Sequence, residues 1–571
     1  MPRFDGGKFG VKLSGRRVYF SNHVLNFYKD TVSPTMAKKC IWSALFLLFS
    51  SVLFRAQAQT IQASSCSESA VASALKSINS DGAVVVVPSG DCVWSTSLTY
   101  NQTNSFTLQG AGAITPAGGS DSTIIEDAVS HAGSDPPMLQ INLVSGKSFR
   151  LTGFSFTTSS GNTGTPTYNG AVRIEGTSNA ARIDHNHFNK IYLVDLNFQG
   201  CVNGVVDHNQ FDGGYAEENQ ERFGSGSCNG DSSGNGNGSW AAPSNFGTSQ
   251  FMYVENNGFQ TVPSSASLHV YPFDCNAGGR FVFRYNKVGY HAVLQTHGTG
   301  GEFDIRGCRA YEVYNNTFTY SSNPTSDNFS MLGMLESGTS LWWGNTVTGF
   351  VSMLEADVVR ANNTTYRMAA TPSGWGYCGT TFGPSNWDQN ASSNGHACLD
   401  SVGYGQGDLL TGTLPNKVDS VTHGITWPHQ KSEPVYVFAN TYNPVPQESG
   451  DTLWKNYPAP AVVSENKDYY LQLPNYSESA SFNGTVGVGQ GPYASMPSTC
   501  TPYVGYWATD KGTWNKSGTG GQGELYVCTA PNTWTLYYTP YTYPNPLTGS
   551  STGPTLTPPA PSGLSGTLVT H

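Results

Sequence analysis

A short segment with an asparagine at its centre recurs along the chain. In each copy an apolar residue precedes two polar or aromatic residues and the asparagine, and Phe, Val or Tyr follows one position later. The clearest copies run from Ile183 to Phe188, Val206 to Phe211, Val254 to Phe259, Phe283 to Val288 and Val313 to Phe318, and looser copies surround Asn345, Asn363 and Asn440. Alternating β-branched and aromatic residues around a turn residue predict strand, turn and strand.

The spacing of these asparagines indicates a stacked fold. They lie 23, 48, 29, 30, 29, 18 and 77 residues apart. Each repeat is one coil, which cannot bury its apolar face alone, so neighbouring coils must stack into a β-solenoid. The spacing of 48 covers two coils or one coil with an insertion, and that of 77 covers irregular chain or further coils. We expect the asparagines to adopt the left-handed backbone and to bond their stacked neighbours.

Residues 59–366 are therefore predicted to form the solenoid, with a different segment at each end. Glu68 to Asn79 carries apolar residues on one helical face, which predicts a short N-terminal capping helix. Residues 367–499 are irregular and have room for further coils. Residues 500–547 are rich in Trp and Tyr, and form either an aromatic cap on the last coil or a small carbohydrate-contacting module. The Pro/Thr/Ser/Gly-rich tail 548–571 is predicted to be disordered.

The start of the chain predicts export. A basic segment at residues 36–39, an apolar run from Ile41 to Phe54 and the sequence Ala-Gln-Ala at 56–58 form a secretory signal with its cleavage site. The mature chain then begins near Gln59, and residues 1–35 are interpreted as a non-native upstream extension. The apolar run is short for a membrane span, and no later segment approaches one. We expect a secreted, periplasmic or cell-surface protein that is monomeric.

Charge and cysteines narrow the partners. The full chain has a formal charge of −10, and residues 1–58 contain nine Lys or Arg and two Asp or Glu, so the mature chain carries −17. Such a chain is a poor nucleic-acid binder. The ten cysteines after residue 58 favour disulfides in an exported protein and fall into sequence-local couples, numbered 66 with 92, 201 with 228, 275 with 308, 378 with 398 and 500 with 528.

Three stretches support a family resemblance. The run from Ala83 to Gly90 reads AVVVVPSG, the run from Phe106 to Gly112 reads FTLQGAG, and Asp-His-Asn-x-Phe occurs twice. Over residues 66–366 this resembles the right-handed parallel β-helix proteins of the pectate lyase and pectin lyase type. The resemblance implies a right-handed parallel β-helix and an arginine or lysine as catalytic base, although this architecture also carries other functions.

One column of side chains suggests a site. If the apolar residue three before each asparagine points inward, the residue two before it points outward. Read coil by coil, this outward column contains Asp184, Asp207, Glu255, Arg284, Tyr314 and Trp343. Carboxylates on neighbouring coils suit Ca²⁺, which would hold a uronate carboxylate and acidify its C5 proton.

In that hypothesis, the first three residues bind the metal, Arg284 acts as base or charge clamp, and Tyr314 and Trp343 bind sugar rings. The alternative is that the column is ordinary solvated surface. A second charged cluster lies between Tyr290 and Glu312 and contains His291, His297, Glu302, Asp304, Arg306, Arg309 and Glu312. It would clamp a carboxylate and transfer a proton, or form an internal ion-pair network that Cys308 fixes.

Three functions remain open from the sequence. A Ca²⁺-assisted polysaccharide lyase acting on a uronate polymer leads. A glycoside hydrolase would use two carboxylates, about 5 Å apart on adjacent coils or about 10 Å apart across two. A non-catalytic protein that binds glycans or spans distance is the third. Glu336, Glu355 and Asp357 lie on later coils, and the sequence does not fix their direction.

Overall fold

The structure is a computed structural model. It describes residues 9–13, 16–20, 58–161, 169–191, 194–213, 218–224, 228, 236–260, 270–289, 294–298, 306–320, 331–350, 352–356, 400, 402–406, 410–411, 418–419, 431–443, 453–455, 463–473, 481–518 and 520–549. The chain divides into two compact units, residues 1–58 and 59–571. In the first, β1 (Phe9–Leu13) pairs with β2 (Arg16–Phe20) in an antiparallel hairpin. The predicted signal run Ile41 to Phe54 lies outside the described residues.

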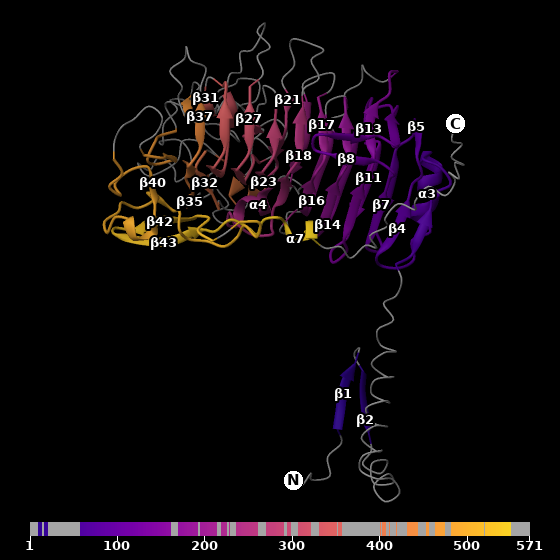
Figure 1. The fold of residues 1–571 in the computed structure, drawn as a ribbon, viewed down its shortest axis with the longest axis horizontal. Helices are drawn as coiled ribbons and strands as arrows, with labels where there is room; N and C mark the ends of the chain where they lie inside the picture. The colour runs from indigo at the N-terminus through magenta and orange to yellow at the C-terminus, as the bar shows by residue number, and fades with distance from the viewer. Residues whose placement is uncertain are drawn as a thin grey trace, which may run out of the picture. The chain divides into compact units, whose positions relative to one another are not determined.

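The second unit is all-β, and most of its strands belong to two parallel sheets (Figure 1). The ten-stranded sheet contains β5 (Gly90–Trp94), β10 (Thr123–Asp127), β13 (Ser155–Thr158), β15 (His187–Asn189), β17 (Gln210–Asp212), β20 (Gly258–Gln260), β24 (Lys287–Val288), β27 (Thr317–Thr319), β30 (Thr346–Thr348) and β37 (Thr441–Asn443). Each pairs in parallel with the next in this order, which is one strand per coil.

The 21-stranded sheet contains β3 (Thr60–Gln62), β4 (Ala83–Val86), β6 (Leu98–Asn101), β7 (Phe106–Gln109), β11 (Leu139–Leu143), β12 (Phe149–Thr152), β14 (Val172–Asp184), β16 (Val194–Asp207), β18 (Glu218–Gly224), β19 (Met252–Glu255), β21 (Val270–Tyr271), β22 (Asp274–Asn276), β23 (Arg280–Arg284), β25 (Leu294–Thr296), β26 (Ala310–Tyr314), β28 (Met331–Leu335), β29 (Thr339–Trp343), β31 (Ser352–Ala356), β36 (Val435–Phe438), β38 (Leu453–Lys455) and β39 (Tyr469–Leu471).

This larger sheet contains two rows of parallel pairings. Row A contains the strands that precede the asparagine turns: β4, β7, β12, the second halves of β14 and β16, β19, β23, β26, β29, β36 and β39. Row B contains β6, β11, the first halves of β14 and β16, β18, β22, β25, β28, β31 and β38. Three parallel rows repeated coil by coil are consistent with a β-helix-like solenoid.

Inward side chains of successive coils stack into one core. Phe156, Phe188, Phe211 and Phe259 form a column with ring centroids 5.4, 5.0 and 4.7 Å apart. All four side chains are buried. Equivalent positions of each repeat therefore meet at the coil spacing of about 4.8 Å, and burial of these rings contributes to the stabilisation of the core.

The repeated asparagines form a continuous ladder of Asn186, Asn209, Asn257, Asn286, Asn316, Asn345 and Asn440, all of which are buried except the half-buried Asn440. The backbone N–H of each donates to the side-chain oxygen of the next, over 2.8 to 3.1 Å. Bonding between stacked neighbours is thus confirmed. The spacing of 48 is one coil with an insertion, because Asp207 pairs directly with Glu255. Asn363 lies outside the described residues.

The prediction of the left-handed residue was wrong by one position. Within the turns it is the residue before the asparagine that has positive φ, for example His208 at 57° and Asn256 at 58°. Each ladder asparagine instead uses its amide to bond backbone carbonyls and its neighbour. The residue with positive φ can therefore carry a side chain that points out of the coil.

At the N-terminal end, α3 (Glu68–Lys76) occupies most of the predicted helical segment. The Ser67 side chain accepts a hydrogen bond from the Ala70 N–H, which satisfies one of the first-turn donors. Val71 and Leu75 are buried in the same core as the first strands. The apolar residues that predicted this helix therefore lie on the face that the helix buries.

Four disulfides lie within the described residues and join Cys66 to Cys92, Cys201 to Cys228, Cys275 to Cys308 and Cys500 to Cys528. All four pairings match the prediction. The remaining predicted pair, Cys378 with Cys398, lies outside the described residues. In the described part of the chain no helix is both long enough and apolar enough to cross a membrane.

Several smaller elements complete the described structure. They are the antiparallel pairs β8 (Ala113–Thr115) with β9 (Gly118–Ser120), β32 (Tyr404–Gly405) with β35 (Lys431–Ser432), and β33 (Leu410–Thr411) with β34 (Val418–Asp419), together with α4 (Asn237–Ala241) and the 3-10 helix η2 (Tyr493–Ser495). The parallel stack passes residue 366 and continues through β36 and β39, so further coils do lie in the segment 367–499.

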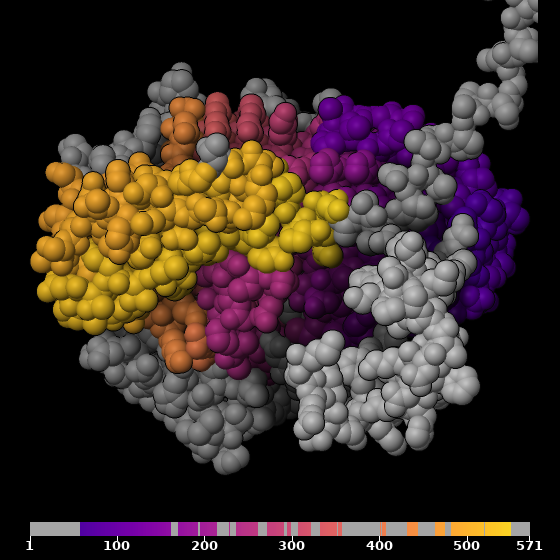
Figure 2. Space-filling view, turned by 60° about the horizontal axis from the view of Figure 1, so that its bottom comes forward, coloured from indigo at the N-terminus to yellow at the C-terminus, as the bar shows by residue number. Residues whose placement is uncertain are grey.

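The aromatic segment forms a sheet of its own. This sheet contains β40 (Val488–Gly491), β41 (Gly505–Ala508), β42 (Glu524–Ala530) and β43 (Thr533–Tyr538), and α7 (Pro546–Gly549) follows. An aromatic cap on the last coil was one expectation. Instead, Trp507, Trp514 and Tyr538 pack against outward side chains of row A along the side of the stack. Figure 2 shows this C-terminal segment, in yellow, lying across that face. We call residues 500–549 the C-terminal strap.

Candidate functional site

The predicted column of outward side chains exists in row A. Strand register places its six members directly above one another, in the order Asp184, Asp207, Glu255, Arg284, Tyr314 and Trp343. The prediction that they form an open groove was wrong. Five of them are fully buried and Trp343 is 3% exposed. They point away from the coil, but neighbouring side chains and the C-terminal strap cover them.

Arg284 shows how the strap closes this face. Its guanidinium donates to the carbonyl oxygens of Tyr541, at 2.8 Å, and Thr542, at 3.0 Å, in the strap. It also donates to Glu255, at 2.7 Å through Nε, and to the Tyr314 hydroxyl at 2.7 Å. Burial alone would lower the pKa of Arg284, but Tyr314 and Glu255 outweigh that effect and raise it above the ordinary value. Arg284 is therefore a buried structural cation and unsuited to act as a base.

The three carboxylates do not fit the predicted Ca²⁺ site. Arg182 forms two hydrogen bonds with Asp207, one to each carboxylate oxygen, at 2.9 and 2.8 Å. Arg284 directs Nε and Nη2 to the same oxygen of Glu255, Oε2, while the Asn545 N–H donates to Oε1. Arg150 pairs with Asp184, and although burial opposes it, this partner helps to hold the pKa of Asp184 at about 2. Guanidinium groups thus neutralise the charges that we had assigned to a metal. Among the described residues no cluster of three His, Cys, Asp or Glu could hold one.

The two predicted sugar platforms are part of the strap interface. The Tyr314 ring stacks on Trp343 with centroids 4.3 Å apart, and Trp343 contacts Trp507 and Trp514 of the strap. Neither ring face is open to a ligand. Their packing contributes to holding the strap in place.

Arg306 and Arg309 form the internal ion-pair network that was the alternative to a carboxylate clamp. Arg306 is fully buried and donates to both carboxylate oxygens of Asp400, and Arg309 lies 2.7 Å from Glu433. Both guanidinium groups lie over the Trp240 ring, 5.0 and 5.6 Å from its centroid. The network ties α4 and residues of the later coils to one part of the stack, beside the Cys275–Cys308 disulfide.

A buried acid beneath the strap predicts a pH effect on stability. Burial raises the pKa of Glu312 to about 7, against hydrogen bonds from the Tyr538 hydroxyl and the Gly247 amide. The unfolded chain releases this proton near pH 4.5, so stability from Glu312 is complete below pH 4.5 and is lost as pH rises towards 7.

Glutamine has no carboxyl group to ionise, so Glu312→Gln is expected to abolish this decrease of roughly 3 kcal/mol in the free energy of unfolding. Chemical denaturation from pH 4 to 8 should show wild-type stability falling relative to Glu312→Gln over this window. Glu126→Gln, at a partly exposed position on β10, is the control and should parallel wild type. Parallel curves for wild type and Glu312→Gln would contradict the assignment.

His297 is the one predicted site residue that lies in row B. It follows β25, and its Nδ1 lies 3.1 Å from a carboxylate oxygen of Asp274 on the preceding coil. Its Nε2 lies 2.7 Å from the Gln295 amide nitrogen. The His297 side chain is 19% exposed, whereas Asp274 is buried. An imidazole fixed at both nitrogens by a carboxylate and an amide is an oriented acid–base group.

The next coils add two carboxylates to this face. Leu335 pairs with Thr296, so Glu336 lies beside His297, and its carboxylate accepts the Gly298 N–H at 2.9 Å. Glu355 pairs with Met334 one coil further. The flanking residues Leu335, Leu354 and Ala356 belong to the core, so strand alternation directs both carboxylates away from it. Both acids are nevertheless buried, Glu336 at 5% and Glu355 at 1% exposure, whereas His297 stays partly exposed. We call Asp274, Gln295, His297, Glu336 and Glu355 the row B site.

Sequence reasoning missed this grouping because it used only the strand before each asparagine. Phe273-Asp274-Cys275 and Leu354-Glu355-Ala356 show the same apolar and polar alternation, and that signal could have placed a second outward column. Their register cannot be read from the sequence, since no marker like the ladder asparagine occurs in these strands. His291, Glu302, Asp304 and Asp357 lie outside the described residues.

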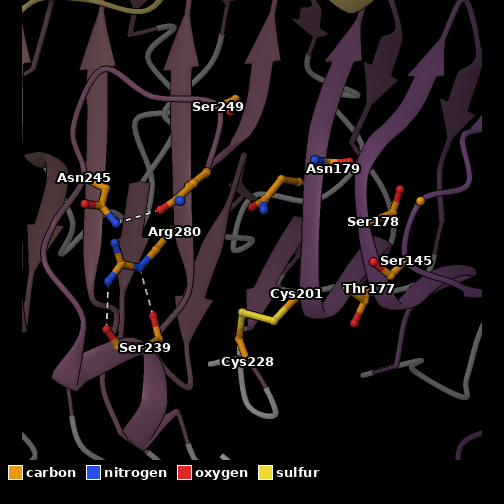
Figure 3. Close-up of a pocket in the computed structure, with 13 residues that line it drawn as sticks. Ser145, Thr177, Ser178, Asn179, Cys201, Cys228, Ser239, Asn245, Ser249 and Arg280 are labelled. Carbon is orange, nitrogen blue, oxygen red and sulfur yellow. Dashed lines mark hydrogen bonds between the residues drawn. A yellow bond between two sulfur atoms is a disulfide. The ribbon is translucent and has the colours of Figure 1, made fainter. Parts of the chain in front are cut away.

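A hollow of about 460 Å³ lies beside the turns that connect row B to row A (Figure 3). Hydroxyl and amide side chains line it, together with the Cys201–Cys228 disulfide. Arg280 is also in its lining. Its Nε and Nη2 donate to Ser239, and its remaining hydrogen bonds go to the carbonyl oxygens of residues 242–244. Arg280 therefore anchors the segment after α4.

Comparison of the chain with protein-family profiles, with curated proteins and with solved structures gave no match. Functional conclusions thus depend on the geometry of the sites described above.

Proposed function

We propose that the unit from Gln59 is a secreted enzyme that cleaves a polysaccharide at the row B site. The observation that carries this proposal is the Asp274–His297 contact of 3.1 Å on the outward face of a parallel stack, with Glu336 on the next coil. Coils stacked in register offer an extended face to a linear polymer, which is the shape of substrate that a polysaccharide presents. Disulfides fit the proposed export.

As a fold, we propose a right-handed parallel β-helix of the pectate lyase type, capped at its start by α3. The three rows of parallel pairings and the asparagine ladder support the architecture. Helix α3 supports the cap because its apolar residues enter the core of the first coils. We propose that the protein acts as a monomer, since the strap already covers the aromatic outward side chains of row A.

Hydrolysis is the reaction that the described groups support best. Glu336 lies two coils beyond Asp274 and two residues further along its strand, because Asp274 pairs with Gln295 and Gln295 with Met334, and His297 lies on the coil between them. Two coils alone separate strands by about 10 Å, so the pair is spaced more widely than the roughly 5–5.5 Å of retaining glycosidases and suits the inverting arrangement, in which a water lies between the carboxylates. One carboxyl group would protonate the leaving oxygen and the other would activate water. His297 would orient this water or supply the proton.

Elimination from a uronate polymer, expected first from the sequence, is the second candidate. It is supported by the contacts of His297. With Nδ1–H directed at Asp274, the neutral ring carries its lone pair on Nε2, which accepts the Gln295 amide N–H. A uronate that displaced this amide would bring its C5 proton to the same lone pair. The Asp184, Asp207 and Glu255 set supplies no Ca²⁺ site to this reaction, because each carboxylate is bound to an arginine.

A substrate panel tests the proposal. The chain from Gln59 would be incubated with polygalacturonate, alginate and neutral glucans and galactans, and both new reducing ends and the ultraviolet absorbance of unsaturated ends would be followed. Reducing ends without absorbance indicate hydrolysis, and both together indicate elimination. Glu336→Gln is expected to lower hydrolysis about 10²–10⁴-fold while Glu126→Gln leaves it unchanged. If no polymer in the panel is cleaved, the enzyme proposal fails and a glycan-binding or structural role replaces it.

A further inference from the structure

A cleft distinct from the row B site lies where three separate segments of the chain meet. Its volume is about 640 Å³. The floor consists of turn residues of row A, one wall contains Pro116 and Ala117 of the β8–β9 hairpin, and the other contains Tyr543 and Thr548 of the strap. A cleft assembled from segments more than 400 residues apart depends on the complete fold.

The floor repeats at the coil spacing. His185, His208, Asn256 and Tyr285 are the left-handed residues of four consecutive coils, with φ between 53° and 58°. Each holds the position before a ladder asparagine, from which the side chain leaves the coil. Three steps of about 4.8 Å give the floor a length of about 14 Å. That length accommodates a short linear chain of sugar rings.

The two histidines are fixed with one nitrogen available. His185 Nδ1 lies 2.8 Å from Asp184, and His208 Nδ1 lies 2.8 Å from Asp207. Their rings stack with centroids 5.3 Å apart and an angle of 3° between planes. Each side chain is about 40% exposed. With Nδ1 held by a carboxylate, Nε2 lies on the opposite side of the ring and can bond a ligand.

The walls are held by direct contacts. Tyr543 stacks on Tyr285 with centroids 3.7 Å apart, and its hydroxyl donates to Asn256 at 2.8 Å. On the other side the Gln260 amide donates to the Pro116 carbonyl at 3.3 Å. The cleft is therefore preformed, which lowers the entropic cost of binding.

Charge in the cleft is positive although the mature chain is acidic. Lys287 is exposed at one end of the floor. The hydrogen bond to Asp207 raises the pKa of His208 against the effect of burial. The charged groups that face the histidines from the packed strands are the acids Asp184, Asp207 and Glu255 and the bases Arg150, Arg182 and Arg284, which form three ion pairs. These pairs cancel, and the positive charge of Lys287 remains, to which His208 adds when it is protonated.

We propose that this cleft is a second glycan-binding site and that its ligand is a linear acidic oligosaccharide. Lys287 and the His208 Nε2–H would bind carboxylate or sulfate groups, and Asn256 and Thr548 would bond hydroxyl groups. The site would hold a polymer on the enzyme without taking part in its cleavage. Its ligand chemistry comes from the cleft alone, so it does not depend on the reaction proposed at the row B site.

The chain itself suggests conservative test variants. Lys287 pairs in register with Thr317 of the next coil, so Lys287→Thr places a residue that the same sheet position already accepts. His208→Asn places the residue that Asn256 provides in the following coil, and asparagine tolerates the left-handed backbone. Lys76→Gln in α3 removes a positive charge away from the cleft and serves as control.

Binding would be measured by calorimetry in the His297→Gln background, so that cleavage of the probes does not disturb the measurement. The probes are tetragalacturonate, a sulfated tetrasaccharide and neutral maltotetraose. We expect one or both acidic probes to bind. Their affinity should be about tenfold weaker in Lys287→Thr and in His208→Asn, and unchanged in Lys76→Gln. Which acidic probe binds identifies the acid.

Affinity should also fall as pH rises from 6 to 8.5, and His208→Asn should flatten this change. The proposal is overturned if neither acidic probe binds at millimolar concentration, if the neutral probe binds equally well, or if both cleft variants keep wild-type affinity. Thermal unfolding of each variant verifies that the strap remains in place.

Discussion

Replacing Arg284 with methionine is expected to lower the free energy of unfolding by about 3–5 kcal/mol. The change leaves Glu255 as a buried carboxylate with the Asn545 N–H but without its cationic partner, and it removes the hydrogen bonds to the strap carbonyls of Tyr541 and Thr542. Cation–π contacts with Tyr253, 4.6 Å from the guanidinium carbon, are lost as well. Denaturant unfolding measures the loss, and limited proteolysis should cut the strap earlier than in wild type.

Two further variants make the result specific. Arg284→Met combined with Glu255→Gln removes both charges and should recover part of the stability, because the unpaired buried charge causes much of the loss. Arg150→Met is the matched control. Asp184 keeps contacts with Arg182 at 3.5 Å and His185 at 2.8 Å, and Arg150 is partly exposed, so a smaller loss is expected. An equal loss for Arg150 and Arg284 would contradict a special role of the strap contact.

His297→Gln is expected to lower the rate of polysaccharide cleavage by about 10²–10⁴-fold while the thermal unfolding temperature stays close to wild type. Glutamine keeps a hydrogen-bonding side chain at a partly exposed position but cannot accept or release a proton near neutral pH. The measurement is kcat on the polymer that the panel identifies. Glu126→Gln, at a partly exposed position on β10 outside both sites, should keep full kcat.

Asp274→Asn separates positioning from chemistry at His297. The carboxylate lies 3.1 Å from Nδ1, and its neutral analogue would no longer favour the Nδ1–H form. We expect lower kcat together with a displaced pH–rate profile, whereas a merely structural residue would leave the profile in place. Full activity in His297→Gln would remove the row B site from consideration.

The asparagine repeats carried most of the fold information. They fixed the coil register, and six residues assigned to one column by counting do lie above one another. The four described disulfides followed because cysteines of neighbouring coils are close in sequence. A repeated, local signal of this kind can be read without tertiary information.

Burial of that column could not be read in the same way. The strap begins 157 positions after Trp343, and nothing in the local sequence around Tyr538 or Tyr541 states which face it covers. Strand alternation correctly directed Asp207 and Arg284 out of the coil, yet outward did not mean solvent-exposed. The hypothesis of an open Ca²⁺ site assumed that no other segment of the chain covers the outward face of the solenoid, and the strap does cover it.

The strap also changes how the repeats behave as a set. A plain array of coils is held only by nearest neighbours, so its ends can open separately. Here Arg182 in β14 donates to the Leu547 and Thr548 carbonyls, and Tyr436 in β36 donates to the Tyr503 carbonyl of the same strap. The segment thus bridges coils that do not touch each other. We expect this longitudinal brace to couple their opening, so that a repetitive molecule unfolds with the cooperativity of a single globular domain.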